Sequence, residues 1–153
     1  MARVLFLTQV LPYPLDSGAK TRGYYVLRQL SQHHEVTLVS FVRAEDRPEA
    51  VVHLSQFCDR VECVPMKRSL WRTARAGLHA LLTDMPAIIE RDNTPEMRRC
   101  LQELCGPFDI VHADQTSMAQ HALAAALFLE RHGYRRPRVV LDAHNALYRI
   151  LDQ

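Results

Sequence analysis

The chain has 153 residues, of which 48% are hydrophobic and 24% charged, and its formal net charge is +2. These values are typical of one globular domain and exclude a disordered chain. The charge is too small to indicate nucleic-acid binding, and the sequence has neither a membrane-spanning apolar run nor a convincing signal peptide. We therefore expect a cytoplasmic protein with no nucleic-acid partner.

The first forty residues have a strand–helix–strand pattern. Val4–Leu7 is continuously apolar, as expected of a strand that is covered on both faces. The helix that follows has Asp16 or Ser17 as its N-cap and apolar residues at helical spacing up to Leu30. A second strand is predicted over Glu35–Phe41.

Strands and helices continue to alternate along the chain. Helices are predicted from Asp46 or Pro48 to Cys58, over Leu70–Thr83, from Thr94 to Cys105 and over Gln115–His132. Strands are predicted over Val61–Pro65, Phe108–His112 and Arg138–Asp142. Segment 115–132 is apolar nearly all round, so we expect it to pack on more than one side. The alternation predicts a doubly wound, Rossmann-like α/β fold with a parallel sheet and helices on both faces.

The loop after the first strand contains four candidate binding residues, Ser17, Gly18, Lys20 and Arg22. Glycine permits close approach to the backbone, the start of a helix favours anions, and the two cations add positive charge. The loop matches neither the P-loop pattern G-x4-G-K-[ST] nor the dinucleotide pattern G-x-G-x-x-G. A capped helix start with solvated cations therefore remains the alternative interpretation.

Two further strand ends carry polar residues. His112 closes the predicted fourth strand, and Asp142, His144 and Asn145 lie at the end of the fifth. The carboxyl ends of parallel strands share one edge of the sheet, where ligands bind in open α/β folds, and histidine there can act as acid, base or hydrogen-bond donor. The other histidines fall on helices or helix ends and are interpreted as surface residues: His33, His34, His53, His79, His121 and His132.

Segment 67–82 combines an apolar helical face with a basic one, a composition that suits peripheral contact with an anionic membrane, at the inner face for a cytoplasmic protein. Most amphipathic helices, however, simply cover a core. The four cysteines form two C-x4-C pairs, which differ from zinc motifs. We therefore expect reduced, mostly buried thiols and no metal.

Taken together, these segments resemble the N-terminal domain of GT-B glycosyltransferases, most closely the retaining enzymes of family 4. The resemblance covers essentially the whole chain. It rests on VLFLTQ at 4–9, PYPLDSG at 12–18, RGYY at 22–25, HEVTLVS at 34–40, FDIVHA at 108–113 and LDAHN at 141–145.

The resemblance implies a role for each candidate residue. In that family two Rossmann-like domains face each other across a cleft, and the N-terminal domain mainly holds the acceptor. Ser17, Gly18 and Lys20 would then lie beside the donor phosphates or the acceptor, and Arg22, further into the helix, is the weaker candidate. The resemblance also implies catalytic contact by His144, orienting roles for Asp142 and Asn145, and a place for His112 on the acceptor side. The family loop usually has a Gly-Gly pair, whereas Ala19 follows Gly18 here.

The family holds its nucleotide-sugar mainly through the C-terminal domain, with two glutamates separated by seven residues, and no such pair occurs here. We therefore expect residues 1–153 to be a truncated N-terminal domain without its C-terminal partner. By itself it would be an inactive half of an enzyme of glycan biosynthesis. Its substrates would be a nucleotide-sugar and a glycan or lipid-linked acceptor, with no cofactor.

Two alternatives remain open. The first is a non-enzymatic α/β module that binds a ligand or a protein. The second is another Rossmann-type enzyme, such as a nucleotide-dependent epimerase or methyltransferase. The second strand ends in Ser40-Phe41-Val42-Arg43 rather than in an acidic residue, which argues against ribose recognition.

Overall fold

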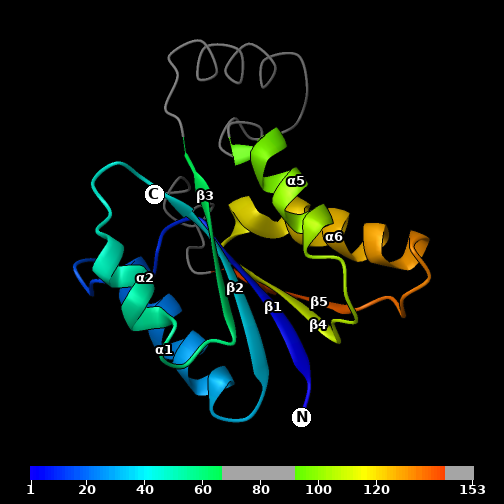
Figure 1. Ribbon diagram of the computed structural model, residues 1–153, viewed down its shortest axis with the longest axis horizontal. Helices are drawn as coiled ribbons and strands as arrows, with labels where there is room; N and C mark the ends of the chain where they lie inside the picture. Colours follow the sequence, from blue (N-terminus) through cyan, green and yellow to red (C-terminus); the bar gives the residue numbers. More distant parts are fainter. Residues whose placement is uncertain (67–91, 144–153) are drawn as a thin grey trace, which may run out of the picture.

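The computed structural model describes residues 1–66 and 92–143, and these residues form a parallel five-stranded sheet between two layers of helices (Figure 1). The strand order is β3-β2-β1-β4-β5. The strands are β1 (Arg3–Thr8), β2 (Glu35–Val42), β3 (Arg60–Pro65), β4 (Ile110–Asp114) and β5 (Arg138–Asp142). The predicted doubly wound, Rossmann-like α/β fold is confirmed.

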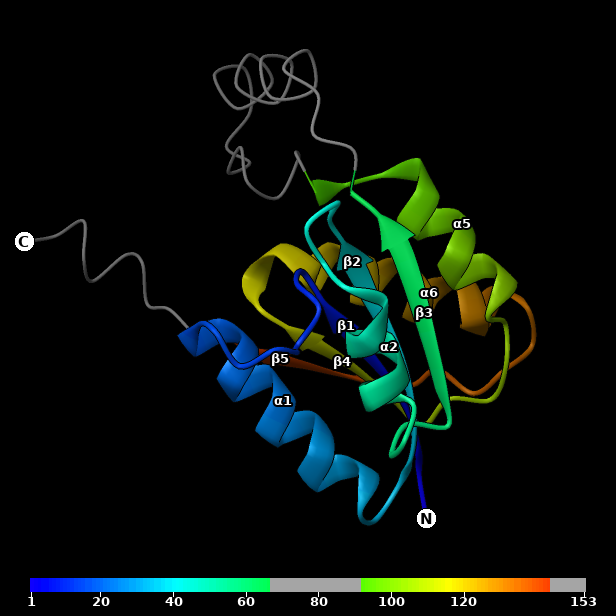
Figure 2. The ribbon, with the colours of Figure 1, turned by 60° about the vertical axis from the view of Figure 1, so that its left-hand side comes forward.

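Helices α1 (Gly18–Ser31) and α2 (Pro48–Leu54) cover one face of the sheet, and α5 (Pro95–Glu103) and α6 (Ala119–Arg131) cover the other (Figures 1 and 2). The starts of α1 and α5 follow from their sequences. The Ser17 hydroxyl accepts a hydrogen bond from the Lys20 N–H at 3.4 Å, and the Thr94 hydroxyl accepts one from the Met97 N–H at 3.1 Å. The predicted helix over Leu70–Thr83, with the basic segment 67–82, lies outside the described residues.

The core has two halves, one on each face of the sheet. On the side of α1 and α2 it includes Val4, Phe6, Val36, Leu38 and Leu27. On the side of α5 and α6 it includes Leu5, Leu7, Val39, Phe41, Val111, Met97 and Ala122. Because helices cover both faces of the sheet, successive side chains of a strand are buried on either face, which explains the continuous apolar runs.

The predicted bounds of the fourth strand and the predicted start of the last helix need correction. The fourth strand covers Ile110–Asp114 rather than Phe108–His112. Segment 115–132 begins with a short 3-10 turn (Thr116–Met118), and α6 itself packs against β4, β5 and α5 as expected, while Leu123 and Leu127 are 50% and 40% exposed. The apolar residues of α6 therefore cover both a buried and an exposed surface.

The strand order creates a switch point between β1 and β4. The β1–α1–β2 and β2–α2–β3 connections pass over one face of the sheet, whereas the β4–α6–β5 connection passes over the other. The loops that leave β1 and β4 therefore diverge at the carboxyl edge, which is where open α/β sheets bind ligands. Within the described ranges, no helix is long and apolar enough to cross a membrane.

Candidate functional site at the sheet switch point

Four polar residues stand side by side at the carboxyl edge of the sheet, on the face that α1 covers. The parallel register pairs Ser40 with Thr8, Thr8 with Asp114, and Asp114 with Asp142. We call Ser40, Thr8, Asp114 and Asp142 the polar row. The first three are buried, and the Thr8 hydroxyl makes no hydrogen bond among the described residues. A buried polar row at a switch point is the structural basis of a candidate site.

His112 lies on β4, two residues before Asp114, and on the same face of the sheet as the polar row. Its register partners are Phe6 on β1 and Val140 on β5. The imidazole stacks on the Phe6 ring, with 4.5 Å between ring centroids and 7° between planes. Ligand atoms of His112, Asp114 and Asp142 all lie within 4.8 Å of one another. The sheet thus brings together two of the residues predicted from sequence, His112 and Asp142, and adds Asp114.

Arg22 connects α1 to the polar row. Its Nη2 lies 2.8 Å from Asp142 Oδ1, and its Nε donates to Asp142 Oδ2 at 3.2 Å. The hydrogen bonds and charge of Asp142 raise the pKa of Arg22. The guanidinium uses Nε and Nη2 in this pair, and its Nη1 makes no hydrogen bond within the described part of the chain. Arg22 is therefore fixed in place with donors still available to a ligand.

Gly23 lets α1 approach the polar row closely. A Cβ atom at this position would lie 2.8 Å from Asp114 Oδ2, a distance that real Cβ atoms do not reach. The glycine is needed for contact between helix and strand and not for a special backbone angle. Gly18 differs, since a Cβ there would meet nothing within 4 Å. The close approach expected at Gly18 would thus concern a ligand and not the chain itself.

The other candidates in the first loop point to a different set of partners. Lys20 Nζ lies 3.1 Å from Asp16 Oδ2 and 3.9 Å from Asp46 Oδ1, so two carboxylates offset its charge. Ser17 caps α1 and is exposed. Arg22, the weaker candidate from sequence, is the one that contacts Asp142. His144 and Asn145 lie outside the described residues.

Gln115 follows the polar row in a strained conformation. Its backbone has φ 100° and ψ 150°, a region that is almost exclusive to glycine. Its N–H donates to the Asp142 carbonyl at 3.1 Å, which holds the β4 and β5 ends together. Sequence reasoning did not select Gln115, because a strained backbone conformation has no recognisable residue pattern. Asp114 could have been selected, because it is a polar residue at the end of a buried strand.

The donor set of His112, Asp114 and Asp142 is one that could hold a divalent cation. The Arg22 guanidinium, however, already binds both oxygens of Asp142. A metal would have to compete with this positive charge for the same carboxylate. The arrangement is better suited to a ligand whose hydroxyl groups donate hydrogen bonds to the carboxylates. A small anion could bind at Arg22.

Two histidines interpreted as surface residues are in fact packed. His121 is 3% exposed, and its Nε2 lies 2.8 Å from the Asp92 carbonyl oxygen. His53 is half-buried, stacks on Tyr13 and hydrogen-bonds the Tyr24 hydroxyl at 2.9 Å. His34 is half-buried, His33 and His132 are exposed, and His79 lies outside the described residues. The error arises because an exposed helix position and a helix-packing position carry the same local pattern.

Acidification should destabilise the protein through His121. Burial lowers the pKa of His121 below its ordinary 6.5, outweighing the hydrogen bond to the Asp92 carbonyl, so the unfolded chain binds more protons just below pH 6.5. The contribution of His121 is therefore complete above pH 6.5 and is lost as the pH falls toward the folded-state pKa. Urea unfolding between pH 5 and 8 should show a shallower pH dependence in His121→Gln. This account would be contradicted if the free energy of unfolding of His121→Gln varied with pH as in the wild type while that of the exposed control His132→Gln did not.

The four cysteines are free thiols. Only Cys58 is buried, two are half-buried and Cys105 is exposed, so the expectation of mostly buried thiols is wrong. Burial raises the pKa of Cys58 to about 12 and that of Cys100 to about 11. Both thiols are therefore protonated and unreactive at neutral pH.

The fold and the site define a doubly wound α/β protein with a buried polar row at its switch point. Comparison with models of protein families, with curated proteins and with solved structures found no match to this chain.

Proposed function

We propose that this chain is the acceptor-binding half of a retaining, family 4-like GT-B glycosyltransferase, which moves a sugar from a nucleotide-sugar donor to a glycan or lipid-linked acceptor. The observation that carries the proposal is the Arg22–Asp142 pair on the polar row, at the carboxyl edge of a switch point. This position agrees with the resemblance of the sequence to that family. A second domain would supply the other wall of the cleft and most donor contacts.

The exposure of the residues suggests a division of roles. Two residues of the site are accessible to solvent: the Arg22 side chain is 55% exposed and the Asp142 side chain 18%. Asp114 and His112 are buried. An acceptor hydroxyl would donate to Asp142, and the Arg22 Nη1 group would donate to a neighbouring oxygen of the substrate. Asp114 and His112 would hold these groups in position from below.

The start of α1 offers a place for the donor diphosphate. Ser17 and Gly18 are exposed at the helix N-terminus, where the backbone N–H groups and the helix dipole favour an anion. His144, after β5, would contact the transferring sugar, with Asn145 as its neighbour. The proposed reaction uses no metal, and the N-terminus of α1 would provide the positive end of a dipole for the leaving diphosphate.

A non-enzymatic α/β binding module is the second candidate. The observation in its favour is the pairing of Lys20 with Asp16 and Asp46, which reduces the charge available to a phosphate.

Ligand-observed NMR tests the proposal, with UDP, GDP, sugar phosphates and polyprenyl phosphates as probes. We expect acceptor-like compounds to bind and free nucleotides not to bind. Arg22→Ala and Asp142→Asn should each weaken binding roughly tenfold, since each removes a charge-assisted hydrogen bond. Arg28→Ala, an exposed cation on the same helix, is the matched control and should leave binding unchanged.

The other outcomes are equally informative. Tight binding of UDP or GDP would overturn the assignment as an acceptor-side half, because the site would then be complete for a nucleotide. Binding of no probe by a folded wild-type chain would favour the non-enzymatic module. A thermal melt of each variant separates lost binding from lost folding.

A further inference from the structure

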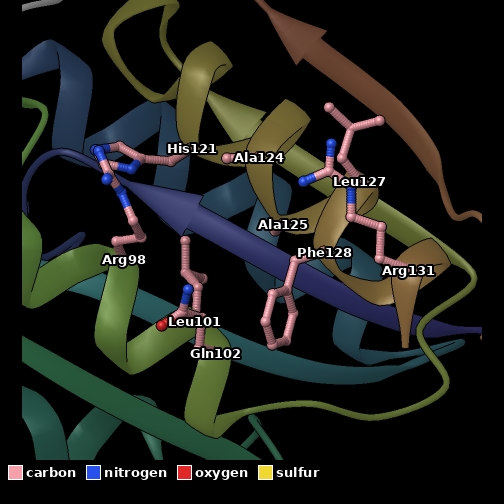
Figure 3. A pocket seen from close by; sticks show the side chains of 9 residues that line it. All are labelled: Arg98, Leu101, Gln102, His121, Ala124, Ala125, Leu127, Phe128 and Arg131. Atoms are coloured by element: carbon pink, nitrogen blue, oxygen red, sulfur yellow. The ribbon is translucent and has the colours of Figure 1, made fainter.

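A groove lies between α5 and α6, on the face of the sheet opposite the polar row (Figure 3). Its volume is about 260 Å³, and its floor is apolar, formed by Leu101 on α5 and by Ala125, Leu127 and Phe128 on α6. The groove exists because small alanines on α6 face the larger side chains of α5. No residue of the polar row lines it.

The rim of the groove is positively charged. Arg98 on α5 lies beside His121 at one end, and Arg131 extends back along α6 toward Leu127 (Figure 3). Arg98 donates to the neutral Asn93 side chain at 3.0 Å. Neither arginine has an acidic partner among the described residues, and the lining contains no aspartate or glutamate. The groove thus combines an apolar floor with an arginine at each end.

The size of the groove restricts what can occupy it. Sites for drug-sized molecules are roughly 300–1,000 Å³, so this groove is smaller than most of them. A single alkyl chain fits such a narrow, apolar space better than a ring system or a peptide helix does. The arginine at the end of the groove favours a negative charge at the end of that chain.

We propose that the α5–α6 groove binds a single-chain anionic amphiphile, with the alkyl chain on Leu101, Ala125 and Phe128 and its carboxylate at Arg98. This site is independent of the proposed glycosyl transfer. The two sites lie on opposite faces of the sheet. A polyprenyl phosphate is itself a single-chain anionic amphiphile, so loss of its binding in Arg22→Ala or in Arg98→Ala tells the two sites apart, and failure of one proposal leaves the other standing.

The test uses decanoate as the probe and isothermal titration calorimetry with ¹⁵N-NMR as the readouts. We expect decanoate to bind with amide shifts around Leu101 and Phe128, and decanol, which lacks the charge, to bind more weakly. The variant Arg98→Ala should lose roughly two- to fivefold in affinity for decanoate, the range expected for one exposed ion pair. The control Arg99→Ala removes an exposed arginine of α5 that does not line the groove and should bind as the wild type does.

A second pair of variants tests the groove itself. Ala124→Trp should fill it and weaken decanoate binding more than tenfold, because the alkyl chain then has no apolar surface to cover. Leu123→Trp places the same ring on the neighbouring exposed position and should have no effect.

Four results would overturn the proposal. The first is no decanoate binding by the folded wild-type chain at millimolar concentration. The second is equal loss in the Ala124→Trp and Leu123→Trp variants, and the third is binding to anionic vesicles without binding to monomeric decanoate. NOEs from another part of the chain to the Phe128 ring would also overturn it, since the groove would then be filled already.

Discussion

Phe6→Ala is expected to destabilise the protein by about 3–5 kcal/mol, because it removes a large, fully buried ring from the middle of the sheet. A loss of this size is a large part of the roughly 5–15 kcal/mol by which native domains are stable. The substitution also removes the surface on which the His112 ring rests. Urea unfolding monitored by circular dichroism measures the change.

Phe6→Leu separates the two effects of the ring. Leucine fills most of the space, so the cost should fall to about 1.5 kcal/mol or less, while the stacked contact with His112 is lost. The ¹H resonances of the His112 ring should then lose the ring-current shift from Phe6. An unchanged His112 spectrum in Phe6→Leu, or equal destabilisation by both substitutions, would contradict the proposed support of His112.

Gly23→Ala and Gly18→Ala should change stability in opposite directions, although both glycines lie in α1. At Gly23 the new Cβ would lie 2.8 Å from the buried Asp114 carboxylate, so the Asp114 side chain, the helix or the strand must shift, at a cost of about 1–3 kcal/mol. At Gly18 the Cβ meets nothing, and alanine should stabilise the helix by about 0.4–1 kcal/mol.

Thermal unfolding of the two glycine variants provides the comparison, and ¹⁵N spectra report on the Asp114 and Asp142 amides. We expect shifts at both amides in Gly23→Ala and none in Gly18→Ala. Equal stability of the two variants would mean that α1 does not rest on the polar row as closely as the structure indicates.

The features that sequence predicted correctly are those set by neighbouring residues. Ser17, one of the two predicted N-caps, caps α1, and Thr94, at the predicted start of its helix, caps α5, since an N-cap bond joins residues three positions apart. The apolar runs of β1 and β2 were sufficient to place those strands within one or two residues. The α/β class followed from the alternation of such segments and needed no tertiary information.

The fourth strand shows where local pattern misleads. Phe108 is buried and looks like the start of a strand, but the ladder begins at Ile110. The Asp109 carboxylate instead accepts a hydrogen bond from the Arg3 N–H at 2.8 Å, in a loop before the strand. The shift has a consequence for the site, because it places His112 and Asp114 inside the strand and on one face.

The candidate site was predicted in part. His112, Asp142 and Arg22 were chosen from their places after or near strand ends, and the structure brings them to one edge. Sequence ranked Arg22 below Lys20 because Arg22 lies further into the helix, and that ranking for ligand contact stays a prediction. Only the rotation of α1 on the sheet determines that Arg22 contacts Asp142 while Lys20 contacts Asp16 and Asp46.

The sequence by itself determined the α/β class, the helix caps and the edge of the sheet where polar residues gather. These depend on periodicity and on hydrogen bonds between near neighbours, which the order of residues specifies. Only the tertiary structure decided that Thr8, Asp114 and Asp142 form one row and that Gly23 must be small there. Register between strands and the approach of a helix depend on residues far apart in the chain, and no local pattern encodes those distances.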